Sequence, residues 1–133
     1  MAQHPNVETL KRGYEAFAKG DMETLRSELF QPDIVWHQGG DNPTAGDYDG
    51  AEQVLGLFGK LFETTGGTFR VNLTSIVGGG DLVIGTGVAS GSRNGDTMTD
   101  EPYAHVAKIK DGKMAEAWIV NLNQDRVDKF YNL

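Results

Sequence analysis

Two histidines are the residues of this sequence best suited to chemistry, because the chain has no cysteine that could act as a thiolate or bind a metal. Histidine changes its charge near neutral pH, so it can serve as a general acid or base. His105 shares one side of a predicted strand with Tyr103, Ala107 and Ile109. If that side faces a cavity, His105 is a catalytic acid or base. The alternative is a core histidine bonded to the backbone.

His37 is the second candidate catalytic residue, at the end of the short run Ile34–His37. Because side chains alternate along a strand, Trp36 and His37 should face opposite sides. We expect Trp36 to form a wall of the cavity and His37 to be a hydrogen-bond donor at its rim. Asp41 could orient His37 or join it as a metal ligand. A loop fixes no ligand geometry, however, so no metal site is predicted.

Three further side chains are candidates for substrate binding. Tyr14 shares a helical stripe with Leu10 and Phe17, so it is either a core residue with its hydroxyl at the cavity edge or a ligand contact. Phe58 lies on the apolar stripe of a later predicted helix. Trp118 belongs to a predicted strand whose inward face the pattern leaves open, so it could form a pocket wall or a dimer face.

Three helices are predicted in the first half of the chain. Pro5 suits the first turn of a helix that Gly20 ends. Asp21 is a good N-cap for a second helix, which Pro32 stops. Apolar residues at spacings of three and four predict a third helix over 51–64, ended by two glycines. A sheet with one apolar face needs such helices as a cover.

The second half of the chain has the pattern of an antiparallel sheet. Asn-Gly and Asp-Gly dipeptides predict tight hairpins, and hairpins join antiparallel strands. Several glycines lie inside a predicted strand, where they allow sharp bending, so the sheet should curl. The predicted strands after the third helix are 69–74, 82–92, 103–110 and 114–122.

Together these elements predict one α+β domain over residues 1–133. We expect a cone-shaped barrel in which a curved antiparallel sheet wraps around the three N-terminal helices. Residues 39–50 are rich in Gly, Asp, Asn and Pro, and are predicted to be a loop beside the mouth of the cone. Residues 125–131 are predicted to form a short terminal helix.

The composition limits the partners of the protein. The formal net charge is −7 and the 12 lysines and arginines are scattered, so no nucleic acid is expected to bind. No apolar run approaches the roughly 18 residues of a membrane span, and the start lacks the pattern of a secretion signal. We therefore expect no membrane partner and a cytoplasmic location. Gly78–Gly80 is not followed by a predicted helix, so it is no phosphate loop, and no cofactor is predicted.

Several short motifs, weak alone, together resemble one superfamily. They are Tyr14-Glu15-Ala16-Phe17 with Gly20-Asp21, the strand 33–37, the loop 43–50 leading to Phe58, and His105-Val106 with 111–114 and Trp118. The combination resembles the nuclear transport factor 2-like superfamily, and within it the SnoaL-like branch, over nearly the whole chain. The resemblance implies a cone-shaped α+β barrel and a homodimer packed through the sheets. Members include ketosteroid isomerases, polyketide cyclases, dehydratases, epoxide hydrolases and non-catalytic binding modules, so fold alone does not choose a function.

The known chemistries of these relatives rest on carboxylates that this sequence lacks. Ketosteroid isomerases use an aspartate base and an oxyanion hole of a tyrosine and a protonated aspartate. By motif these three positions fall at Gly13, near Gln38 and at His105, so none matches. SnoaL-type cyclases carry an acidic residue on the last strand after Trp118, where this sequence has Asn121. We expect Gln38 and Asn121 to bind substrate, since an amide orients a carbonyl but carries no proton.

Two functions from different classes follow. The first is a cofactor-independent isomerase, cyclase or hydratase that acts on a small hydrophobic molecule in an apolar pocket. His105 would be its acid or base, and His37 or Tyr14 would polarise an oxygen. The second is a non-catalytic module that binds a small ligand, or a dimeric scaffold, as the missing carboxylates suggest.

Overall fold

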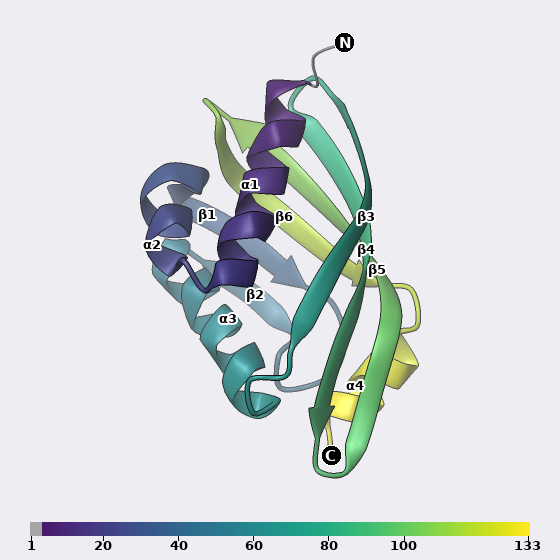
Figure 1. Cartoon of the computed structure of the whole chain (residues 1–133). Coiled ribbons are helices and arrows are strands. Elements are labelled where there is room, and N and C mark those ends of the chain that lie inside the picture. The colour runs from purple at the N-terminus through teal and green to yellow at the C-terminus, as the bar shows by residue number, and fades with distance from the viewer. Residues whose placement is uncertain (1–3) are drawn as a thin grey trace.

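The computed structural model describes residues 4–133, and it confirms the predicted α+β class (Figure 1). Helices cover one face of a single sheet (Figure 1). The elements in chain order are α1 (Pro5–Lys19), α2 (Met22–Thr24), the π-helical turn η1 (Leu25–Leu29), β1 (Phe30–Gln38), β2 (Gly46–Asp49), α3 (Ala51–Thr64), β3 (Arg70–Gly79), β4 (Leu82–Arg93), β5 (Asp96–Lys110), β6 (Lys113–Asn121) and α4 (Gln124–Tyr131).

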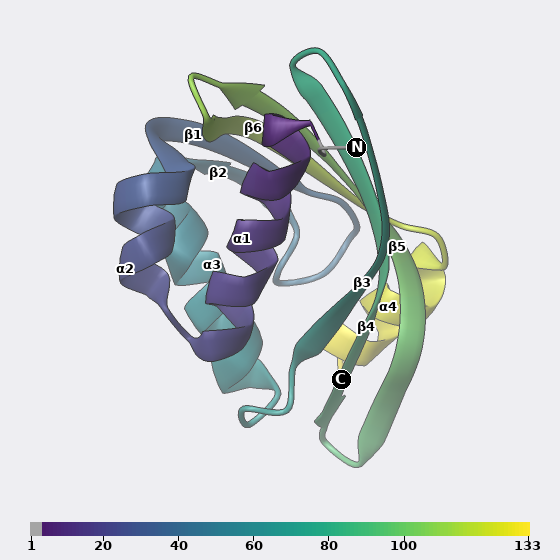
Figure 2. The same cartoon turned by 45° about the horizontal axis from the view of Figure 1, so that its top comes forward.

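The sheet has six strands in the order β2-β1-β6-β5-β4-β3. Its C-terminal strands are antiparallel, as predicted, and β1 pairs with β6 in parallel. The sheet curves around α1 and α3, which lie on its concave side (Figures 1 and 2). It does not close, because β2 and β3 remain as free edges. The predicted barrel is therefore an open, curved sheet wrapped around the helices.

The predicted caps and turns have clear physical causes. Gly20 ends α1 with a φ of 71°, a left-handed conformation that glycine adopts without strain. The Asp21 side chain accepts from the Thr24 amide at the start of α2, as an N-cap does. Both predicted hairpin dipeptides have positive φ at both residues, the geometry of a tight two-residue turn. Local chemistry thus fixes the end of α1, the start of α2 and the two hairpins.

The predicted loop over 39–50 differs from the structure, because it contains β2. This strand pairs antiparallel with β1 at the edge of the sheet, where Asp49 lies opposite Val35 and Asp47 opposite His37. An edge strand of polar residues shows no apolar alternation, so the sequence pattern gives no sign of it. The predicted terminal helix over 125–131 is confirmed as α4, which begins one residue earlier, at Gln124.

The inner face of the sheet is closely packed around two glycines of β4. On β4 the inward positions include Gly85 and Gly87, both buried. A Cβ atom at Gly87 would lie 2.5 Å from the Asn72 carbonyl oxygen and 2.8 Å from the Tyr103 hydroxyl. Only glycine therefore fits there, and its missing side chain makes room for Tyr103.

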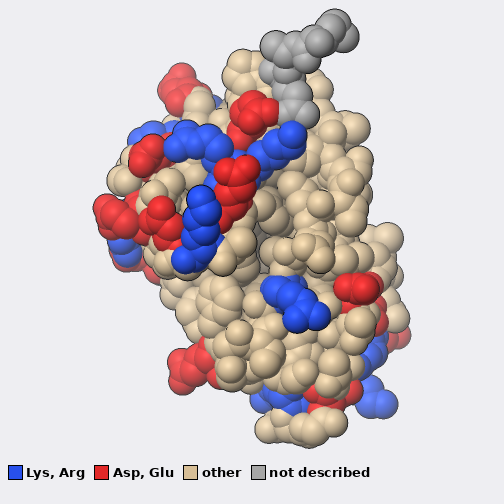
Figure 3. Space-filling model, viewed as in Figure 1, with Lys and Arg blue, Asp and Glu red and all other residues tan. Residues whose placement is uncertain are grey.

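Charged side chains gather on the outward surface of α1, α2 and η1, as Figure 3 shows over the helices. They form ion pairs such as Arg12 with Glu28, and Arg26 with Glu23 and Glu52. Exposed pairs of this kind add little stability. No helix among residues 4–133 is long and apolar enough to cross a membrane.

Candidate functional site

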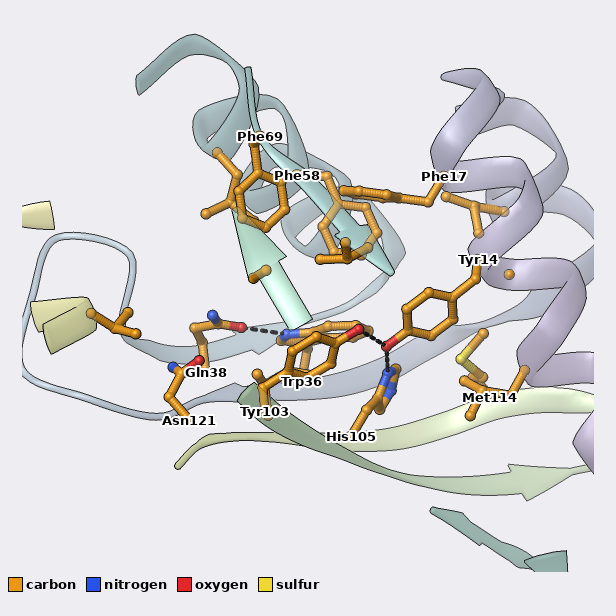
Figure 4. Close-up of a pocket in the computed structure, with 18 of the residues that line it drawn as sticks. Tyr14, Phe17, Trp36, Gln38, Phe58, Phe69, Tyr103, His105, Met114 and Asn121 are labelled. Atoms are coloured by element: carbon orange, nitrogen blue, oxygen red, sulfur yellow. Dashed lines mark hydrogen bonds between the residues drawn. The ribbon is translucent and has the colours of Figure 1, made fainter. Parts of the chain in front are cut away.

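A cavity lies between the concave face of the sheet and helices α1 and α3 (Figure 4). About 100 Å³ of it is open to the centre of a water molecule, several times the roughly 10–15 Å³ that one water needs. Among the described residues no Asp, Glu, Lys or Arg lines it, so it favours an uncharged molecule. Its lining is mostly apolar, and its polar side chains are Tyr14, Trp36, Gln38, Tyr103, His105, Asn121 and Tyr131.

His105 lies on the inner face of β5 and is only 2% exposed. Its Nδ1 atom is 2.9 Å from the hydroxyl oxygen of Tyr14, which comes from α1. The Tyr103 hydroxyl donates to the same oxygen over 2.9 Å. Figure 4 shows the three side chains converging at one end of the cavity. We call this hydrogen-bonded series the Tyr–Tyr–His chain.

Burial keeps all three members of the Tyr–Tyr–His chain uncharged at neutral pH. It lowers the pKa of His105 to about 4, because the charged imidazolium is desolvated there. Burial also raises the pKa of Tyr103 to about 12. The pKa of Tyr14 lies well above its usual value, chiefly through burial and then through Tyr103. The site therefore begins any reaction with a neutral imidazole and two neutral phenols.

The Tyr–Tyr–His chain holds one more donor proton than it has hydrogen bonds. Each tyrosine supplies one O–H proton and the neutral imidazole one N–H proton, whereas only two hydrogen bonds join the three groups. His105 Nε2 is buried and has no partner among the described residues. If Nε2 carries the ring proton, that N–H is left over; if Nδ1 carries it, the Tyr14 O–H is left over. In both tautomers one buried donor lacks an acceptor.

Trp36 forms the wall beside the Tyr–Tyr–His chain. Its ring lies edge-on to that of His105, with centroids 5.0 Å apart, and edge-on to that of Phe58 at 5.2 Å. The Trp36 Nε1 atom donates to Gln38 Oε1 over 3.0 Å. This bond orients the Gln38 amide and leaves its NH₂ group without a partner among the described residues.

The cavity brings together most of the predicted site residues. Asn121 lies near Gln38 in Figure 4, away from Tyr14. Its Nδ2 donates over 3.4 Å, a long hydrogen bond, to Gln124 Oε1. The roles of these side chains remain predictions. The predicted residues that line the cavity are Tyr14, Trp36, Gln38, Phe58, His105 and Asn121.

His37 and Trp118 do not line the cavity, because they lie on the opposite face of the sheet. They are cross-strand partners on β1 and β6, and their rings stack with centroids 5.4 Å apart. Since Trp36 points inward, strand alternation turns its neighbour His37 outward. The structure therefore does not fit a catalytic role of His37 at the cavity. It also does not fit Trp118 as a wall of the pocket.

His37 is instead held between two carboxylates. Its Nε2 is 2.6 Å from Glu116 and its Nδ1 is 2.7 Å from Asp47, and these hydrogen bonds raise its pKa. The expected partner Asp41 lies elsewhere, where its amide donates to Asp128 of α4. The two carboxylates bind opposite nitrogens of one ring. No group of three or more His, Asp or Glu residues within 4–133 is placed to hold a metal ion.

Two polar cavity residues, Tyr103 and Tyr131, were missing from the sequence-based prediction. Tyr103 shares the inward face of β5 with His105, so alternation alone could have identified it. Tyr131 comes from α4, whose docking against the end of the sheet no local pattern reveals. Its hydroxyl is buried and has no partner among the described residues.

Comparison with known proteins places this fold and site in a family. The profile of the SnoaL-like domain matches residues 10–117. Bal32a, from a soil-derived mobile gene cassette, is 34% identical, with 96% of this chain and 97% of that one covered and a TM-score of 0.91. IdmH, a proposed polyketide cyclase from Streptomyces antibioticus, is 30% identical over 90% and 94%, with a TM-score of 0.69. An uncharacterised protein of Mycobacterium tuberculosis is 26% identical over 86% of each chain. The chain therefore belongs to the SnoaL-like domain family.

Proposed function

We propose that the protein is a cofactor-independent isomerase, cyclase or hydratase that acts on a small, uncharged, hydrophobic molecule containing a carbonyl group. One observation carries this proposal: the Tyr–Tyr–His chain presents an unpaired donor inside a cavity whose described lining has no charged side chain. A carbonyl oxygen is the neutral acceptor that such a donor lacks. The 30% identity to IdmH, a proposed polyketide cyclase, supports the same class of chemistry.

The His105 tautomer with its proton on Nδ1 supplies both groups that enolisation needs. In that tautomer Nδ1–H donates to Tyr14, the Tyr14 O–H is free for the carbonyl oxygen, and Nε2 is a free base. Nε2 takes a proton from the carbon next to the carbonyl, and the electron pair moves to the oxygen as an enolate. Tyr14 stabilises that oxygen by hydrogen bonding. Return of the proton from His105 to another carbon of a conjugated enolate gives an isomer. When the enolate carbon instead attacks a second carbonyl and closes a ring, the new alkoxide takes that proton.

Deuterium exchange into a simple ketone tests this proposal. 4-Ethylacetophenone incubated with the protein in D₂O should lose its acetyl C–H signals in the NMR spectrum faster than in buffer. His105→Gln and Tyr14→Phe should each reduce the enzymatic rate at least tenfold, since positioned acid–base groups contribute typically 10²–10⁴-fold. His37→Gln is the matched control on the other face of the sheet and should leave the rate unchanged. Exchange that survives both cavity substitutions would exclude the assigned chemistry.

The second candidate is a non-catalytic module that binds the same kind of ligand. It is favoured by the low pKa of His105, since a value of about 4 makes proton uptake at neutral pH costly. No carboxylate among the described residues lines the cavity to replace that base. Native mass spectrometry after prolonged incubation separates the two: a ligand bound and chemically unchanged supports binding alone, and a changed mass or exchanged deuterium contradicts it.

A homodimer packed through the outer face of the sheet is also part of the proposal. One row of cross-strand partners on that face runs Val77, Ile84, Val106, Trp118. Val77 is 63% exposed and Ile84 41%, and Val120, two residues after Trp118 on β6, is 54% exposed. An exposed apolar surface of this kind is suited to a second copy of the chain.

A further inference from the structure

Helix α4 completes the cavity with residues that lie beyond the family match. The SnoaL-like profile ends at residue 117, whereas Val127 and Tyr131 of α4, together with Asn121 at the end of β6, line the cavity. Figures 1 and 2 show α4 packed at the end of β6, beside the long β4–β5 hairpin. This end of the cavity is therefore shaped by a part of the chain that the family profile does not describe.

The Tyr131 hydroxyl is a second buried polar group without a partner. Tyr131 is 4% exposed, and its hydroxyl makes no hydrogen bond among residues 4–133. Burial raises its pKa, and the nearby Arg93 opposes that rise. A guanidinium only donates hydrogen bonds, so Arg93 cannot accept the Tyr131 proton. Like the spare donor of the Tyr–Tyr–His chain, the Tyr131 O–H therefore lacks an acceptor.

The position of Tyr131 is well fixed. Asp128 accepts hydrogen bonds from the Asp41 amide and the Asn42 side chain, which ties α4 to the segment after β1. Arg126 binds Asp96 with both Nη atoms, at 2.8 and 3.0 Å, which ties α4 to the β4–β5 hairpin. Rearrangement of the helix is therefore a poor way to satisfy the hydroxyl, and a ligand oxygen is the simpler one.

We propose that Tyr131 is a ligand-binding residue whose hydroxyl donates to a second oxygen of an uncharged apolar ligand, so that the natural ligand carries at least two acceptor oxygens. The first oxygen binds the Tyr–Tyr–His chain, and in that respect the inference rests on the proposed function. Tyr131 then selects among ligands of similar shape by an oxygen remote from the reacting carbonyl. A ligand oxygen that pairs this hydroxyl gains one hydrogen bond, which a similar molecule without that oxygen cannot make.

Three benzene derivatives of nearly equal shape test this inference: 1,4-diethylbenzene has no carbonyl oxygen, 4-ethylacetophenone has one and 1,4-diacetylbenzene has two. The isomer 1,3-diacetylbenzene offers the two oxygens at a different distance from each other. Calorimetric titration of the wild type should show the tightest binding for a diketone. Tyr131→Phe, which removes only the hydroxyl, should weaken diketone binding about fivefold to tenfold, the value of one neutral hydrogen bond, and leave diethylbenzene within twofold. The inference would be overturned if Tyr131→Phe and the wild type prefer the diketones over the other probes to the same degree. It would also be overturned if the wild type binds none of the probes.

A stability measurement and a second variant make the test specific. Loss of an unpaired hydroxyl from an apolar site should not lower the melting temperature. A clear drop for Tyr131→Phe would mean that the hydroxyl has a structural partner, and the inference would be wrong. Tyr14→Phe should weaken binding of the monoketone as well as the diketones. If Tyr14→Phe changes no affinity while Tyr131→Phe does, the proposed function fails and the role of Tyr131 as a binding residue stands.

Discussion

The sheet carries two histidine–tryptophan pairs, one on each face, and their environments are opposite. The consecutive residues Trp36 and His37 take part in both, because Trp36 contacts His105 inside and His37 stacks on Trp118 outside. The inner histidine has apolar neighbours, two phenols and a lowered pKa, whereas the outer one has two carboxylates and a raised pKa. One step along a strand therefore separates a neutral imidazole from one that favours its charged form. The face of the sheet, and not the residue type, decides which chemistry is available.

The largest expected effect of this contrast is the acid sensitivity caused by His105. Its folded pKa of about 4 lies below the unfolded value of about 6.5, so the unfolded state binds the extra proton and stability falls as the pH drops from 6.5 to 4. The loss should approach about 3 kcal/mol, at 1.36 kcal/mol for each unit of pKa. Urea unfolding at pH 7 and pH 4.5 measures it, and His105→Gln should reduce the difference. An NMR titration of His105 with a midpoint above pH 6 would refute this account.

The second effect tests the close packing of the inner face. Gly87→Ala should destabilise the fold by about 1–3 kcal/mol, because the new Cβ meets a fixed backbone carbonyl and the Tyr103 ring. Gly56 in α3 is the matched control, since a Cβ there has open space, and Gly56→Ala should stabilise by about 0.5–1 kcal/mol. Thermal unfolding compares the two variants. Equal effects would show that the clash at Gly87 relaxes freely.

The outer histidine should show the reverse pH dependence, with a smaller amplitude. Because its folded pKa is raised, the stability from His37 is fully present below its unfolded pKa, while Glu116 and Asp47 are ionised, and is lost as the pH rises through the folded value. The amount should be at most about 1 kcal/mol, since the pair is partly exposed. Glu116→Gln should remove most of this loss between pH 6 and pH 9 in urea unfolding. If the variant loses as much stability between pH 6 and pH 9 as the wild type, the two carboxylates do not stabilise charged His37 as described.

The smallest effect on the fold itself is expected on the outer apolar row. Ile84→Lys changes an exposed side chain, so the stability of the monomer should change by less than about 0.5 kcal/mol. If the outer face joins two copies, the same change should shift the protein from dimer to monomer in sedimentation equilibrium. Glu63→Lys, on the exposed side of α3, is the control and should leave the mass unchanged. A wild-type protein that is monomeric at high concentration would rule out the proposed dimer.

The sequence predicts the fold better than the site because the two depend on different signals. Turn dipeptides, Gly20 and the alternation around His105 are local, and the structure follows them. The outward position of His37 follows from the same alternation, yet its partners do not. Asp47 reaches His37 only through β2, a polar edge strand without a local pattern, and Glu116 only through the pairing of β1 with β6. Contacts between strands distant in sequence are what a single chain leaves undetermined.

The parallel pairing of β1 with β6 has a consequence for how the protein matures. Trp36 and Gln38 come from β1, whereas His105 and Asn121 come from β5 and β6, so the cavity joins the two ends of the chain. During synthesis, β1 and the early helices cannot bury their apolar faces until β6 has been made. Long-range pairing of this kind slows folding and leaves half-formed apolar surfaces exposed. Truncation before β6 should therefore yield an aggregating fragment that cannot bind the ketone probes.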